Sequence, residues 1–170
     1  MVDCMFHHNY AAEQGGAIHW NAATIGPMEL HGCTFLHNWS GTTGGAVRAS
    51  TGVIIEGCVF KYNTAETNGG AISYGSYTGG GASHIANVGG VWYPTDGILD
   101  LDSETVFIGN RAKGTSYPYY FPDSEVGHGG AIHVFADFVT NQNAWAVYLN
   151  NNYEPYKLQV RLRGASFEDN

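Results

Sequence analysis

The sequence predicts an all-β protein, a right-handed parallel β-helix whose short strands wind into stacked coils. Three observations predict it: a recurring Phe-x-x-Asn motif, a Gly-Gly-Ala-Ile or Gly-Gly-Ala-Val motif after it, and short runs of alternating apolar residues. In the first three copies the first Gly follows the Phe by nine residues. Self-similarity at this scale is typical of a solenoid, and parallel crossovers turn right-handed.

Phe-x-x-Asn occurs five times in this register, and its Phe residues are separated by 29, 25, 47 and 60 residues. The two shorter separations each fit one coil of a solenoid. We therefore expect about four coils plus a partial fifth, with long loop insertions in the third and fourth coils. The excess residues fall at about 74–96, 113–126 and 135–156.

Composition supports one folded segment spanning residues 1–170. Hydrophobic residues make up 44 % of the chain, and the 24 glycines follow no triplet period, which excludes collagen. The formal net charge is −8 and the seven Lys and Arg residues form no cluster, so nucleic acid is not an expected partner. No apolar run approaches the ~18 residues that span a bilayer. Because the sequence starts and stops within repeats, we expect an excerpt of a longer chain, or copies that associate end to end.

Alternation predicts three strands in each coil, with one face apolar and turned inward. In the Gly-Gly-Ala-Ile strand the inward set includes Ile18, Val47 and Ile72. The alternate positions are expected to point outward: Ala17, His19, Ala46, Arg48, Ala71, Ser73, Ala131 and His133. Antiparallel hairpins are not expected, and the insertions are interpreted as loops on the coils.

Stacked coils place like residues above one another, so the repeated Phe and Asn positions predict structural ladders. An Asn side chain in such a ladder can satisfy turn backbone groups. Asn38 also begins the acceptor sequence Asn-Trp-Ser, which leaves glycan attachment as an alternative for this residue. The predicted ladder residues are Phe6, Asn9, Phe35, Asn38, Phe60, Asn63, Phe107, Asn110, Phe167 and Asn170.

The three cysteines, Cys4, Cys33 and Cys58, each lie two residues before a ladder Phe. This shared register predicts buried free thiols, although a disulfide between neighbouring coils remains an alternative. We expect no cofactor and no metal site, because the cysteine and histidine spacing lacks close ligand sets. His7 and His8, for example, are adjacent and would face opposite ways on a strand.

Asp100, Asp102 and Glu104 alternate and would form an outward carboxylate row, able to attract a cation or act as acid and base. The duller interpretation is a solvated strand face. Gly127-His128-Gly129 is similar to a short motif of pectin-cleaving hydrolases, but the companion carboxylate segments are missing and the repeat already explains Gly129. Two aromatic segments, Trp92-Tyr93 and Tyr117 to Phe121, would stack on sugars or pack over the coils.

The alternating Phe-x-x-Asn and Gly-Gly-Ala-Ile motifs resemble the repeats of the chlamydial polymorphic outer-membrane proteins, whose passenger regions are β-helical and adhesive. The resemblance implies an extracellular or cell-surface protein that presents loops to a protein or glycan partner, or serves as a stalk or fibre component. It favours a structural or adhesive role over catalysis. The alternative from another class is a polysaccharide lyase or glycoside hydrolase of the β-helix type.

Overall fold

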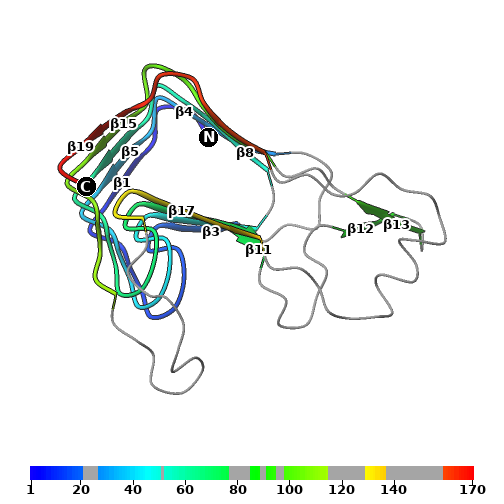
Figure 1. Cartoon of the computed structure of the whole chain (residues 1–170), viewed down its shortest axis with the longest axis horizontal. Helices are drawn as coiled ribbons and strands as arrows, with labels where there is room; N and C mark the ends of the chain where they lie inside the picture. Colours follow the sequence, from blue (N-terminus) through cyan, green and yellow to red (C-terminus); the bar gives the residue numbers. More distant parts are fainter. Residues whose placement is uncertain are drawn as a thin grey trace.

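Stacked parallel coils make up the computed structural model of the chain (Figure 1). The described residues are 1–20, 27–50, 52–76, 85–88, 91–94, 98–114, 129–136 and 159–170. Neighbouring strands in the stack come from successive coils and run parallel, in register. The predicted right-handed parallel β-helix is confirmed.

Four parallel sheets, here called A to D, run along the stack, and each coil contributes one strand to each sheet it reaches. Sheet A contains β4 (Met28–His31), β8 (Val53–Glu56), β14 (Ile98–Leu101) and β18 (Gln159–Leu162). Sheet B contains β1 (Met5–His7), β5 (Thr34–Leu36), β9 (Val59–Lys61), β15 (Val106–Ile108) and β19 (Ser166–Glu168). Sheet C contains β2 (Tyr10–Ala11), β6 (Trp39–Ser40), β10 (Thr64–Ala65) and β16 (Arg111–Ala112). Sheet D contains β3 (Ile18–Trp20), β7 (Val47–Ala49), β11 (Ile72–Ser76) and β17 (Ile132–Ala136).

Two details of the strand prediction were wrong. Three strands per coil were expected, but the two-residue strands of sheet C, directly after each Asn, add a fourth. Such short strands have too few residues to show alternation. In addition, β12 (Ile85–Val88) and β13 (Val91–Pro94) pair antiparallel within the first insertion, where only a loop was expected.

A column of phenylalanine rings fills the interior beside sheet B. Neighbouring rings stack with centroids 4.6 to 4.9 Å apart and planes within 7° of parallel. The rings of Phe35, Phe60 and Phe107 are fully buried. The column therefore supplies a continuous apolar core that each coil extends by one ring.

A column of asparagines runs beside the phenylalanines at the turn from sheet B to sheet C. Asn38 donates from Nδ2 to Oδ1 of Asn63 at 2.9 Å, and Asn63 donates in the same way to Asn110. Asn38 Nδ2 also donates to the Phe6 carbonyl oxygen, and the side chain is 1 % exposed. This leaves no room for a glycan on Asn38 in the folded chain.

The paired glycines each meet a different steric demand. The first of each pair has a positive φ, for example 68° at Gly44, which favours glycine. The second lies under the backbone of the next coil: a Cβ on Gly45 would meet the Gly70 carbonyl oxygen at 2.0 Å. The Gly-Gly pair thus marks a corner where successive backbones approach closely.

The alternate positions of sheet D were expected to be outward, and the central coils depart from that expectation. Arg48 is 1 % exposed, and Ser73 and Ala71 are fully buried, whereas His19 in the first coil is exposed. Although the residue as a whole is exposed, partial desolvation of its ring, and then the charge of Arg48, lowers the pKa of His19, while Glu13 acts in the opposite direction. The alternation of apolar residues identified the inward face of sheet D. It did not show whether other residues cover the opposite face.

Candidate functional site

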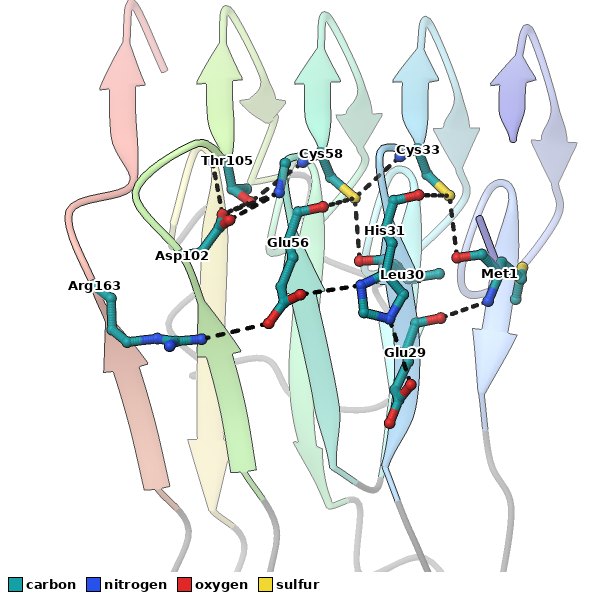
Figure 2. Close-up of polar contacts among 11 residues, drawn as sticks. Met1, Glu29, Leu30, His31, Cys33, Glu56, Cys58, Asp102, Thr105 and Arg163 are labelled. Atoms are coloured by element: carbon teal, nitrogen blue, oxygen red, sulfur yellow. Dashed lines mark hydrogen bonds and ion pairs between the residues drawn. The ribbon is translucent and has the colours of Figure 1, made fainter. Parts of the chain in front are cut away.

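Charged side chains from four coils meet on the outer face of sheet A and form what we call the charged row. Figure 2 shows its members Glu29, His31, Glu56 and Arg163. The strands place them there because inward Leu30, Ile55 and Leu101 alternate with outward polar positions. The charged row consists of Glu29, His31, Glu56, Asp100 and Arg163.

Each member of the charged row contacts another member, either in a different coil or two residues along the same strand. His31 Nδ1 lies 3.1 Å from Glu56 Oε2, and His31 Nε2 lies 3.4 Å from Glu29 Oε2. Arg163 Nε donates to Asp100 Oδ1 at 2.8 Å, and Arg163 Nη2 lies 3.9 Å from Glu56 Oε1. The carboxylates are thus engaged with nitrogen partners, which suits bracing of the coils. Because Arg163 and Glu56 are about half exposed, each such pair contributes at most about 1 kcal/mol.

Asp102 belongs to the turn after sheet A rather than to the charged row. Its carboxylate accepts hydrogen bonds from Gly57 N at 3.1 Å, Thr105 N at 3.0 Å and Thr105 Oγ1 at 2.7 Å. Partial desolvation raises the pKa of Asp102, but the Thr105 hydroxyl and the backbone N–H groups outweigh it and hold the pKa below its usual value. Asp102 therefore fixes the turn of its own coil to the preceding coil.

The structure separates the residues that the catalytic alternative required. Strand β14 ends at Leu101, so Asp102 and Glu104 lie in the following turn and do not continue the strand row of Asp100. Asp100 is nearly buried and paired with Arg163, whereas Glu104 is exposed. His128 lies outside the described residues, as do Tyr117 to Phe121.

The three cysteines are free, and they stack at the corner between sheets A and B. Cys33 N donates to Cys58 Sγ at 3.3 Å, and Cys58 N donates to Thr105 Oγ1 at 3.3 Å, so Thr105 takes the same place in the next coil. Burial raises the pKa of the Cys58 thiol to about 12. The thiols act as small hydrogen-bonding side chains in a ladder.

In the described part of the chain, no group of three or more His, Cys, Asp or Glu side chains is arranged so that it could hold a metal ion. The same part also contains no helix long and apolar enough to cross a bilayer.

Two columns of rings on the outer surface, at the corner between sheets B and C, were missed from the sequence. His8 stacks on His37, which stacks on Tyr62, with centroids 5.2 Å apart at each step. Beside them Tyr10 stacks on Trp39 at 4.4 Å. Aligning the repeats would have revealed the first column, because His8, His37 and Tyr62 each directly precede a ladder Asn.

Comparison with known families bears on one coil. Residues 57–74 match the Chlamydia polymorphic membrane protein repeat. This segment is similar to that repeat. The matched segment includes Phe60, Asn63 and the Gly69 to Ile72 motif, which are the positions that form the ladders and the close corner. No curated protein and no solved structure matches the chain.

The matched segment belongs to one coil of the stack, and its Phe, Asn and Gly-Gly positions have counterparts in the other coils. The resemblance seen in the motifs is confirmed by the match, and the repeat family implies a surface or outer-membrane location. The matched segment begins at the corner between sheets A and B and includes Phe60 and Asn63 of the two ladders. It ends within β11, the strand of this coil in sheet D.

Proposed function

We propose that this chain is an extracellular, cell-surface scaffold with an adhesive role, whose β-helix presents its inserted segments to protein or glycan partners. The observation that carries this proposal is that the ladders continue without change across the insertions. Phe60 and Phe107 are 47 residues apart yet stack at 4.8 Å, and Phe107 and Phe167, 60 residues apart, stack at 4.9 Å.

A solenoid suits this role because each coil contacts only its neighbours, so an insertion between strands leaves the next coil able to dock. Asn110 spans the first long insertion by accepting from Asn63 at 2.9 Å, and it spans the last by donating to Asn170 at 2.8 Å. The coils supply rigidity, and a changed sequence in an inserted segment would leave the ladder contacts of the coils in place. A recognition role for loops on a rigid support is the common arrangement in proteins.

In the same proposal, the coils could also serve a mechanical role as part of a stalk or fibre. The last coil leaves its inward positions open: Leu162 is 53 % exposed and Phe167 is 43 % exposed. Further coils, from the same polypeptide or from a second copy, would cover these side chains. Electron microscopy of the purified chain would distinguish single particles from filaments.

Adhesion is tested with beads coated with the purified chain and applied to cultured epithelial cells. We expect attachment above that of albumin-coated beads, and loss of attachment when residues 115–128 or 137–158 are replaced by a short Gly-Ser linker. Circular dichroism would verify that each variant keeps its β structure. Wild-type beads that attach no better than albumin-coated beads, or full attachment by both linker variants, would overturn the proposal.

A further inference from the structure

The outer ring column ends abruptly in the fourth coil. His8, His37 and Tyr62 occupy one position in the first three coils, and Gly109 occupies it in the fourth. All four residues have a φ between 52° and 57°, so the backbone follows the same path in each coil. The column therefore ends because a side chain is missing, not because the backbone changes course.

Tyr62 bends over the place where the fourth ring would stand. Its Cδ1 and Cε1 atoms lie 2.6 Å from the position of a Cβ built on Gly109. One face of the Tyr62 ring is against His37, and the side chain is nonetheless 44 % exposed. Part of the Tyr62 ring therefore fills the space beside Gly109, and the rest of the side chain presents aromatic surface to solvent.

Two basic residues lie close in the sequence to Tyr62 and Gly109, in a chain of net charge −8. Lys61 places Nζ 5.0 Å from the centroid of the Tyr62 ring. Arg111 lies two residues beyond Gly109, and its side chain is exposed. Within the described part of the chain, no ion pair engages Lys61 or Arg111. Lys113, by contrast, is already paired with Glu66 at 2.6 Å.

We propose that Tyr62, Lys61 and Arg111, around Gly109, form a binding site for an acidic sugar unit of a glycan. The C–H groups on one face of a pyranose ring carry partial positive charge and pack against the negative face of an aromatic ring. A carboxylate or sulfate on the sugar would meet the ammonium group of Lys61 and the guanidinium group of Arg111, which binds such anions in a bidentate manner.

The backbone at Tyr62 is held in place by the residue that follows it. Its neighbour Asn63 is fully buried and holds the turn through four hydrogen bonds to the coils on either side. A ring that is already oriented loses little conformational entropy when a ligand stacks on it. This site lies in the coils themselves, so it goes beyond the scaffold role and does not depend on the inserted segments.

The decisive variant is Gly109→His, because His occupies the same position, with the same backbone conformation, in the first two coils. A Cβ at residue 109 would meet the Tyr62 ring at 2.6 Å, so the ring must rotate, and the new imidazole would then cover the exposed surface of Tyr62. We expect Gly109→His to fold with an unchanged or slightly lower melting temperature, because the Tyr62 side chain can move. We expect it to lose acidic-sugar binding by about tenfold or more, because the stacking surface is gone.

Binding would be measured on the purified chain by calorimetry and saturation-transfer NMR, with 3′-sialyllactose and trigalacturonate as probes and maltotriose as the neutral control. We expect at least one acidic probe to bind and maltotriose not to bind. His8→Ala, at the far end of the column, is the matched control and should bind as the wild type does. The double variant with Lys61→Gln and Arg111→Gln should lose binding to the acidic probe.

Three outcomes would overturn the site: neither acidic probe binds, maltotriose binds as well as the acidic probes, or Gly109→His binds as the wild type does. Should Gly109→His not fold, Tyr62→Leu takes its place, and undiminished binding by that variant overturns the site as well. Because no cells are involved, failure here leaves the adhesion result untouched, and failure of adhesion leaves this measurement untouched.

Discussion

Asn38 gives two hydrogen bonds to a single atom of Asn63. Its Nδ2 lies 2.9 Å and its backbone N lies 3.0 Å from Asn63 Oδ1. The same geometry recurs between Asn63 and Asn110 and between Asn110 and Asn170. The buried ladder residues Asn38, Asn63 and Asn110 therefore each donate to one neighbouring coil and accept from the other. Loss of a central Asn would remove hydrogen bonds on both sides.

Replacing Asn63 by Ala should lower the free energy of unfolding by about 2–4 kcal/mol, because buried donors and acceptors on both sides lose their partners. Urea denaturation would measure this loss. Asn9→Ala is the matched control: Asn9 is exposed at the end of the ladder, and its side chain donates to Asn38 without accepting from another ladder Asn of the described residues. Its loss should cost less than about 1 kcal/mol. Equal losses in the two variants would contradict the cooperative ladder.

Phe60 should contribute more to stability than any terminal ring of its column. It is fully buried between Phe35 at 4.6 Å and Phe107 at 4.8 Å, whereas Phe167 is 43 % exposed. Phe60→Ala should cost about 3–5 kcal/mol, and Phe167→Ala clearly less. Thermal unfolding followed by circular dichroism would rank the two variants, and the reverse ranking would show that the column is not the core.

Cys58 should resist alkylation in the folded chain, because burial raises its pKa to about 12 and the thiolate is the reactive form. Iodoacetamide at about pH 8 should modify partly exposed Cys4 first and Cys58 only after denaturation. Mass spectrometry of tryptic peptides would measure both rates. Comparable labelling of Cys4 and Cys58 under native conditions would refute the prediction.

The same thiol predicts a loss of stability in alkali. The folded-state pKa of Cys58 lies above the unfolded value of about 9, so the stabilisation is complete below pH ~9 and disappears as pH rises toward 12. Urea midpoints measured between pH 8 and 11 should therefore fall more steeply for the wild type than for Cys58→Ser. Parallel curves for the two proteins would remove the thiol as the cause.

Asp102 predicts the opposite dependence at acid pH. Its folded pKa is lowered, so its contribution is present above the unfolded pKa of about 4 and is lost as pH falls through the folded value. Asp102→Asn should lower stability at neutral pH by about 1 kcal/mol, because an amide nitrogen would face N–H donors. Glu104→Gln, an exposed change in the same turn, should leave the urea midpoint unchanged.

Much of the fold was predictable because the repeats have a fixed internal spacing. Phe35 and Phe60 could be aligned from the sequence, and in a solenoid an aligned position is a stacked position. The same reasoning could have placed Tyr62 and Gly109 in one column, since both precede a ladder Asn. Strands of two residues, such as β6 and β10, carry no alternation and could not be found in that way.

The candidate site was less predictable, because it depends on where each strand stops. Asp100 and Asp102 share a sequence pattern, yet β14 ends between them, so Asp100 pairs with Arg163 and Asp102 holds a turn. Nothing in the spacing shows that Arg163, 63 residues away, would reach Asp100. The burial of Arg48 is likewise a property of what surrounds sheet D.

By itself the sequence determined the coil, because hydrogen-bonding and apolar side chains at fixed offsets select one way of stacking. The tertiary structure alone decided what the outer surface became. Tyr62 leans over Gly109 only because coils from distant parts of the chain meet at one corner, and Arg163 reaches Glu56 and Asp100 only across coils. Inward positions are constrained by contact with their own repeats, whereas outward positions acquire neighbours only once the chain has wound.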